Sequence, residues 1–444
     1  MRLYITLLVI LLMVATPSGT AARGFASDYG TWSGDDGWHT PVGTMVSDSN
    51  WSPRVRTTTL WRGGVELEAP VLTLGDGERL LLRFDVLGAE MGNYRYRIEH
   101  CDSQWRKDGL EPYEYMNGFE EGPVEGYESS FTTLTDYVYH YQYIPSQYSQ
   151  FLVSGNFVVT VYDQDQPDSV LLTRRFYVTE GSLKAQVEVG VPYDGGKVRE
   201  RREVDVRVTE NNDYRGDQPR PSLNEAWCSV VVQQNGRTDN MRRLVFSGLE
   251  NDALCYRHRN ENLFWCGNRF RWFDISNIRT ATYNVAQIAE YGGEWFATLK
   301  PLEDRSGKSY VTEDVLNGGM KVNVWDRTNK QTEADYVWVN FVLPMVYPYM
   351  NGSVHVVGEL TQWRLDEASR MEYRPDLKAY TLRLHLKQGY YSYQLLFLPV
   401  GETEGSTGVL EGDYFETPNQ YTAFVYYRGP NDRYDRLAAI GRYR

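Results

Sequence analysis

Three consecutive residues near position 100 combine the groups that a nucleophilic site needs. His100, Cys101 and Asp102 supply a base, a thiol and an acid, and a thiolate paired with histidine is an effective nucleophile. His100 ends the alternating run NYRYRIEH and Cys101 and Asp102 follow it, and neighbouring side chains along a strand point to opposite faces. His100 and Cys101 therefore cannot pair by adjacency alone, and no GxSxG elbow is present. We expect no catalytic residue, no cofactor and no enzymatic activity.

Carboxylates at spacings of two and three follow in YDQDQPDSV, where Asp163, Asp165 and Asp168 resemble the pattern of a calcium loop. The glycine and the bidentate glutamate of an EF-hand are missing, so we favour a solvated hairpin turn. The histidines elsewhere show no HxH or HExxH spacing. The sequence predicts no metal site.

Four cysteines allow three disulfide pairings in an oxidising compartment. Cys255 and Cys266 flank the loop-like stretch YRHRNENLFW and are the pair we select. Four buried free thiols remain an open alternative. Because no CxxC occurs, the pattern does not indicate a zinc or thioredoxin-type site.

An aromatic platform is the remaining binding motif. In SVHVVGELTQW (residues 353–363), an apolar strand runs through Gly358 into a polar turn that ends at Trp363. This stretch is similar to one in starch- and glycogen-binding sandwich modules, whose tryptophan stacks on a sugar ring. Tyr373 or Tyr391 could supply a second ring. We favour a structural or protein-contact use over glucan binding, because a fold does not carry its function with it.

Arginines gather in RYDRLAAIGRYR, at positions 433, 436, 442 and 444 of an otherwise acidic chain. Arg433, Arg436 and Arg442 are candidates for docking on acidic loops of a partner. The alternative is a closing strand whose arginines pair with nearby carboxylates, and we favour it because exposed ion pairs are common and weak.

Short strands must position all of these residues. RLLLRFDV places Leu80, Leu82, Phe84 and Val86 on one face, and EVDVRV and YTLRLHLK alternate in the same way. A period of two indicates half-buried antiparallel strands, and Gly, Asn and Asp clusters separate them. The fold class is therefore all-β, as tandem immunoglobulin-like β-sandwich domains.

The first residues predict export. Arg2 precedes an apolar run that leads to small residues at positions 20–22, which is typical of a signal peptide over residues 1–22. That run is too short to span a bilayer, and we expect no membrane span later. The net charge of −13 repels phosphate backbones, so nucleic acid is excluded as a partner.

Composition divides the 444 residues further. We expect an extended lead-in at residues 23–56, a first β-sandwich at 57–182 and a second at 183–343. A third, glycogen-binding-like sandwich is expected at 344–444.

Several blocks together resemble the plug protein family of the type IX secretion system of Bacteroidota. They include YRYRIEHCDSQW (94–105), YESSFTTLTDYVYHYQYIPS (127–146), GNRFRWFDISNIRT (267–280) and EGDYFETPNQYTAFVYYRGPNDRYDRLAAIGRY (411–443). The resemblance covers the chain beyond residue 55, in order. QQNGRTDN departs from the family at Thr238, where an aromatic residue is expected.

The resemblance implies a periplasmic, non-enzymatic protein whose partner is the giant outer-membrane barrel translocon of that system. Such a plug closes the periplasmic opening while no cargo is engaged. We expect the chain to remain in the periplasm, since no cargo-type sorting domain follows the matching segment. The alternative is a glycan-binding accessory protein or glycan-active enzyme. The docking surface, its affinity and the release trigger do not follow from the sequence.

Overall fold

The computed structural model describes residues 42–313 and 315–443. The expected signal peptide at 1–22 and the first part of the lead-in at 23–56 lie outside these residues. Helical structure in the described part is short: α2 (Pro112–Tyr115), η1 (Asn260–Asn262) and η2 (Glu359–Thr361). None of these helices has the length and apolar character needed to cross a bilayer. Strands make up the regular structure elsewhere, which confirms the all-β sandwich class.

The first sandwich contains two main sheets around one apolar core. One sheet has β1 (Ser49–Asn50), β12 (Val170–Thr179), β11 (Gly155–Asp163), β5 (Tyr94–Cys101) and β7 (Glu121–Pro123) in that order, with β3 (Val71–Thr73) beside β12. The other has β2 (Val55–Arg62), β4 (Leu80–Leu87), β9 (Tyr137–Ile144) and β8 (Gly126–Ser129), and β10 (Gln150–Phe151) pairs with β6 (Met116–Asn117) at one end.

Alternation explains why these strands form where the sequence predicts them. Leu80, Leu82, Phe84 and Val86 are each at most 2% exposed and fill the core from β4. The lead-in differs from expectation, because β1 pairs with β12 and the Ser49 side chain is fully buried. The first sandwich therefore begins before residue 57.

The second sandwich is built from two separate parts of the chain. One sheet has β13 (Leu183–Gly190), β14 (Arg201–Glu210), β18 (Ala253–Tyr256) and β17 (Gly248–Glu250), with β19 (Leu263–Trp265) also on β14. The other has β16 (Arg242–Leu244), β15 (Cys228–Gln234), β29 (Tyr421–Tyr427) and β30 (Arg436–Tyr443). Their shared core joins valines of β14 and β15 to residues of β29.

The third sandwich lies between those two parts in sequence. Its nine-stranded sheet has the order β20 (Arg271–Asp274), β28 (Gly389–Pro399), β25 (Gly352–Val357), β26 (Arg370–Arg374), β27 (Ala379–Lys387), β24 (Tyr336–Pro344), β22 (Glu294–Leu299) and β21 (Val285–Tyr291), with β23 (Met320–Val322) beside β28. A single core contains residues of β20, β22, β24, β25 and β28.

The expected boundary at residues 343 and 344 therefore does not separate the sheets. β24 pairs with β27 from Tyr336↔Lys387 to Pro344↔Ala379, so it belongs to the third sandwich. β29 pairs with β15 from Cys228↔Tyr427 to Gln234↔Tyr421, so the last strands belong to the second. Periodicity identifies a strand and its buried face, but it does not identify the strand beside it.

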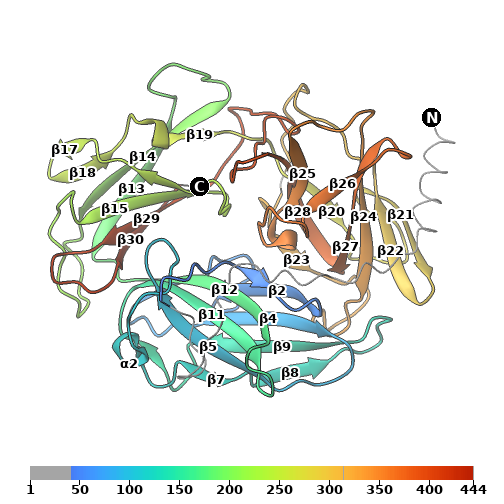
Figure 1. Cartoon of the computed structure of the whole chain (residues 1–444), viewed down its shortest axis with the longest axis horizontal. Helices are drawn as coiled ribbons and strands as arrows, with labels where there is room; N and C mark the ends of the chain where they lie inside the picture. The colour runs from blue at the N-terminus through green and yellow to red at the C-terminus, as the bar shows by residue number, and fades with distance from the viewer. Residues whose placement is uncertain (1–41, 314, 444) are drawn as a thin grey trace.

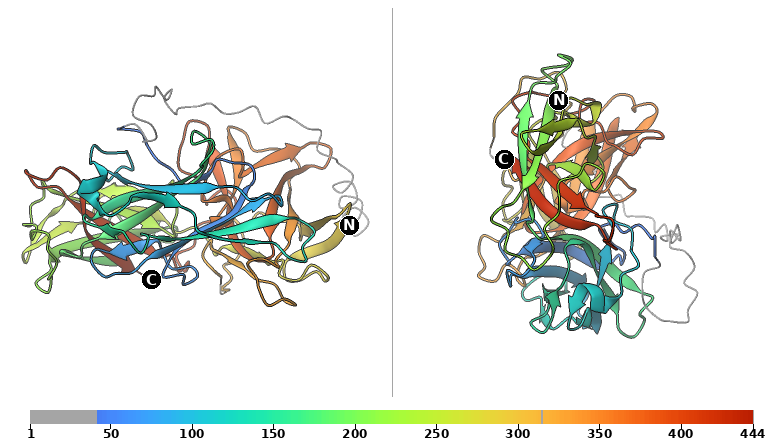
Figure 2. Two further views of the ribbon diagram at one scale, coloured as in Figure 1. Left: turned by 90° about the horizontal axis from the view of Figure 1, so that it is seen from below. Right: turned by 90° about the vertical axis from the view of Figure 1, so that its left-hand side faces the viewer.

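The three sandwiches lie side by side around a common centre. Figure 1 shows the first at the bottom, the second at the left and the third at the right, in a view down the shortest axis. Figure 2 shows this flattened body from below and from one side. Each sandwich therefore has a neighbour on two sides.

The cysteine pair selected from the sequence does not form. Cys255 lies opposite Arg207 of β14. The Cys266 amide donates to the carbonyl of Glu200, just before β14, and Glu200 and Arg207 are seven residues apart along the chain. That separation is about 23 Å along a strand, far beyond the roughly 7 Å that a disulfide spans. Cys101, Cys228, Cys255 and Cys266 are all buried free thiols.

Thiol counting tests this arrangement. Alkylation of the folded protein should be slow because the thiols are buried. Unfolding in guanidinium without reductant should expose all four thiols, so that four cysteines per chain become alkylated. Mass spectrometry of the intact chain gives the count. A count of two or zero after unfolding would mean that disulfides are present.

Candidate functional site

A buried ion pair joins the first and third sandwiches. Asp85 of β4 accepts a hydrogen bond from Lys387 Nζ of β27 at 2.6 Å, and both side chains are at most 2% exposed. The hydroxyl of Tyr336 donates to the same Asp85 oxygen at 2.6 Å. Lys387 also donates to the Gln331 carbonyl at 2.6 Å and lies 4.0 Å from the ring centroid of Tyr137. Both charges thus have polar partners at the junction.

Burial is the largest influence on both of these charges. It raises the pKa of Asp85 and lowers the pKa of Lys387, while the attraction between the two groups opposes both shifts. A charge taken out of water is costly unless it is paired and hydrogen-bonded. The pair therefore favours one position of β4 against β27, because other positions separate the charges.

A loop of the first sandwich adds further bonds at this junction. The amides of Leu134 and Thr135 donate to the two oxygens of Asp335 at 2.6 and 3.0 Å. The Tyr137 hydroxyl donates to the Ala334 carbonyl at 2.8 Å. Asp335 directly precedes β24, so the loop is attached where that strand begins.

A second buried ion pair joins the first and second sandwiches. Arg436 of β30 donates to both oxygens of Glu180, at 2.6 and 3.2 Å, and both side chains are at most 4% exposed. Ser154 donates to Glu180 at 3.0 Å and accepts from the Leu437 amide at 3.1 Å. This bidentate geometry is the strong form of an arginine–carboxylate contact.

Aromatic contacts extend this second junction. The rings of Tyr177 and Phe424 stack with centroids 4.3 Å apart. The Tyr426 hydroxyl donates to Asn156 at 2.8 Å between buried side chains. The outer faces of β12 and β29 are therefore packed against each other.

Arginines close the third junction, between the second and third sandwiches. Arg242 of β16 donates to both oxygens of Glu404, at 3.0 and 2.9 Å. Arg237 pairs with Asp239 and donates to the Gly405 carbonyl at 2.8 Å. Each sandwich is thus bonded to the other two.

A cavity of about 510 Å³ lies where the three sandwiches meet. All three contribute to its wall, and aromatic rings and arginines stand out among the lining side chains. They include Trp61, Trp105, Arg174 and Tyr177 from the first sandwich, Phe424 and Arg442 from the second, and Trp363 from the third.

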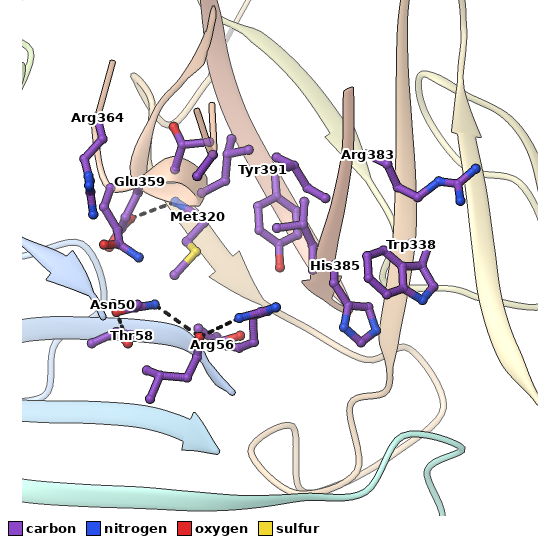
Figure 3. Close-up of a pocket in the computed structure, with 18 residues that line it drawn as sticks. Asn50, Arg56, Thr58, Met320, Trp338, Glu359, Arg364, Arg383, His385 and Tyr391 are labelled. Carbon is purple, nitrogen blue, oxygen red and sulfur yellow. Dashed lines mark hydrogen bonds between the residues drawn. The ribbon is translucent and has the colours of Figure 1, made fainter. Parts of the chain in front are cut away.

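A smaller cavity of about 280 Å³ adjoins it between the first and third sandwiches. Figure 3 shows Asn50, Arg56 and Thr58 on one side and the stacked pair Trp338 and His385 near the other end. The two stacked rings lie 4.1 Å apart, and burial lowers the pKa of His385 to about 4. His385 is therefore neutral at pH 7.

Glu359 of η2 lines both cavities. Burial raises its pKa to about 7, although the Met320 amide donates to its carboxylate at 2.9 Å and Arg174 attracts the charge. The charge state of Glu359 therefore changes near neutral pH.

The sugar-platform residues do not share a surface. Tyr391 is 1% exposed and stacks on Phe273 inside the third core. Tyr373 is half-buried, and its hydroxyl donates to the Val346 carbonyl at 2.7 Å. Trp363 packs edge-on against Phe270 and faces the central cavity. The core and the domain junction thus take two of the three rings away from solvent.

The terminal arginines also have separate surroundings. Arg436 is the buried partner of Glu180, so it cannot dock on another protein. Arg433 is exposed and pairs with Glu114 across the first–second boundary. Arg442 lines the central cavity. Pairing with nearby carboxylates therefore describes Arg433 and Arg436 better than a free docking patch.

The residues that suggested a nucleophilic site are structural. His100 Nδ1 lies 2.5 Å from Asp108, and the ring packs between Phe157 and Tyr434. Burial raises the pKa of the Cys101 thiol, and Glu99 adds to the shift. A protonated thiol in an apolar cluster is inert at neutral pH.

An exposed group of rings marks one end of the first sandwich. Tyr113, Phe119 and Tyr148, which we call the aromatic patch, are 76%, 72% and 74% exposed. Ser149 joins two of their loops, since its hydroxyl accepts from the Phe119 amide at 3.1 Å and donates to the Phe119 carbonyl at 2.8 Å. Aromatic side chains are enriched at protein interfaces.

These features define a class of protein, a rigid assembly of β-sandwiches. Three β-sandwiches are fastened by buried ion pairs, and the candidate nucleophile is locked in a core. The arrangement is suited to holding a shape and presenting a surface.

Comparison with known proteins supports the resemblance over the first sandwich. Residues 55–180 match the family model described as type 9 secretion system plug protein, first domain, which confirms the resemblance over this part of the chain. A crystal structure of a hypothetical protein from Parabacteroides merdae ATCC 43184 is similar at a TM-score of 0.85 and 29% identity. The alignment covers 90% of this chain and 99% of that one. None of the curated proteins matches.

The residues that fasten the sandwiches do not follow from the sequence. Asp85 alternates with core residues of RLLLRFDV, which predicts a solvated face shared with Arg83. The third sandwich covers that face. The sequence does show a carboxylate within a largely apolar strand, which suggests that Asp85 is buried. It does not show that the residue paired with Asp85 is Lys387.

Removing one partner of the first ion pair should destabilise the protein strongly. Lys387→Met leaves Asp85 buried without its cation, and such a change costs about 3–5 kcal/mol. The double variant Asp85→Leu/Lys387→Met should recover most of this loss, because no isolated charge remains. Urea unfolding measures the free energy. Lys184→Met, which breaks an exposed pair with Asp213, is the control and should change little.

The Glu359 carboxyl should make stability depend on pH. Its folded pKa lies above the unfolded value of 4.5, so the folded state holds a proton that the unfolded state releases. The free energy of unfolding should fall by about 1–3 kcal/mol as pH rises from 4.5 to 7. Glu359→Gln should remove this pH-dependent part of the stability. Glu402→Gln, which changes an exposed glutamate, should retain it. Identical pH profiles for wild type and Glu359→Gln would contradict the assignment.

Proposed function

We propose that this protein is a non-enzymatic periplasmic plug. It binds the periplasmic opening of the type IX secretion translocon in the outer membrane and seals the pore while no cargo is engaged. The observation that carries the proposal is the match of residues 55–180 to the first domain of the plug family. That domain is also the one that forms buried ion pairs with both of the others.

Rigidity supports this role. A seal over a wide pore must not bend away when it is pushed from one side. Domains joined by a single linker move relative to one another by default. Here each sandwich contacts two others, so moving one requires breaking two junctions that contain ion pairs.

The aromatic patch is the surface that we assign to docking. Tyr113 belongs to α2 of the family-matched sandwich, and Phe119 and Tyr148 lie in two loops of the same sandwich that Ser149 joins. Tyrosine and other aromatic side chains supply most of the energy at many interfaces. Affinity is limited, because a plug must leave when cargo arrives and buried area alone does not set affinity.

Membrane permeability tests the sealing role. Deleting the gene in cells with an intact translocon should admit large antibiotics that are normally excluded, because the pore would remain open. Growth inhibition by such antibiotics gives the readout. Sensitivity should disappear when the translocon is also deleted, and unchanged sensitivity in the single deletion would refute sealing.

Co-purification tests the docking surface. The double variant Phe119→Ser/Tyr148→Ser should retain little of the large outer-membrane protein recovered with wild type. Tyr347→Ser, which is 79% exposed on the third sandwich, is the matched control and should recover it normally. Loss with Tyr347→Ser alone would move the docking surface to the third sandwich.

A further inference from the structure

Two acidic side chains and a histidine meet on the second sandwich. Val204 and Val206 of β14 point into the core, so Glu203 and Asp205 lie together on the opposite face of that strand. β18 runs antiparallel to β14 with Val206 opposite Tyr256. β18 ends at Tyr256, and His258, whose backbone is left-handed, contacts Glu203 two residues further along.

The donor atoms of these side chains are close enough to share one ion. A carboxylate oxygen of Glu203, one of Asp205 and a ring nitrogen of His258 all lie within 4.8 Å of one another. Glu203 accepts from the His258 amide at 2.9 Å, and its Oε1 lies 2.8 Å from His258 Nδ1. The Glu203 side chain is 4% exposed and that of His258 is 53% exposed. The cluster thus has a buried wall and an open side.

Electrostatics leave this cluster short of positive charge. Oxygens of Glu203 and Asp205 lie within 4.8 Å of each other, so the two carboxylates repel one another when both are charged. The guanidinium of Arg257, which also acts on Asp205, forms its ion pair with Glu250. A cation between the carboxylates would remove this repulsion.

A buried amide at the same place lacks a partner. Asn262 is fully buried, and its Nδ2 donates to the carbonyls of Val204 and Tyr256 and lies 3.4 Å from Asp205 Oδ1. Among the described residues its Oδ1 has no hydrogen-bond partner. Amide bond lengths place that oxygen within roughly 6 Å of the Asp205 oxygen. A bound water or ion is one of the partners that such a buried acceptor can take.

We propose that Glu203, Asp205 and His258 bind one divalent transition-metal ion, with zinc the best fit. Mixed imidazole and carboxylate donors suit zinc and its neighbours, whereas calcium and magnesium take oxygen ligands. The exposed side of the cluster leaves room for water in the remaining position. The ion connects β14 to the segment after β18 and so stabilises the second sandwich.

Metal titration of the mature chain tests this site. The purified protein is stripped with a chelator and titrated with ZnCl2 by calorimetry, and one ion per chain is expected. Glu203→Gln keeps the side-chain shape, and His258→Asn suits the left-handed backbone at φ +56°. Each substitution should weaken zinc binding at least about tenfold. Loss of a residue that only orients a metal ligand already reduces metal affinity by about that factor, and these two residues are proposed as ligands.

Controls separate the proposal from its alternatives. Glu188→Gln changes an exposed glutamate of the neighbouring strand β13 and should bind zinc as wild type does. Zinc should raise the unfolding temperature of wild type and Glu188→Gln but not of the two site variants, which also reports whether each variant folds. Absence of saturable zinc binding, tighter binding of CaCl2 than of ZnCl2, or full binding by His258→Asn would each overturn the site.

Discussion

The architecture depends on placing charges where water cannot reach them. Asp85 and Lys387 come from different sandwiches, as do Glu180 and Arg436, and each group would be unfavourable alone in its buried position. Such pairs add little net stability compared with apolar packing, but they are selective, because an incorrect alignment leaves a charge unpaired. Apolar faces alone would allow two sandwiches to slide. The buried pairs therefore set the relative positions of the three domains.

The sequence predicts what happens within strands and misses what happens between domains. Leu80, Phe84 and Val204 lie in cores as their alternation requires, and the turn chemistry separates the strands correctly. Asp85 and Lys387 also alternate correctly, but their outer faces are covered by a neighbouring sandwich. Local periodicity records which side of a strand is apolar. It contains no information about a second surface that covers the polar side.

The stretch around Trp363 shows how a familiar pattern acquires another use. The strand and turn expected from the sequence form as β25 and η2, and Trp363 follows directly after the turn. Gly318 allows the indole to approach the backbone, since a Cβ added there would lie 2.2 Å from the ring. The ring therefore sits against the domain junction, and its partner Tyr391 fills a core. The ring that suggested a sugar platform is thus used in contacts within the chain.

The interrupted second sandwich has a consequence for how the chain folds. Strands β13 to β19 are separated in the chain from β29 and β30 by the entire third sandwich. Until β29 joins it, β15 lacks the neighbour that completes its sheet, and an unpaired strand edge readily joins another chain. The third sandwich can close in the meantime and bring the two halves close together. The sheet of β15 is therefore complete only when the last strands of the chain have joined it.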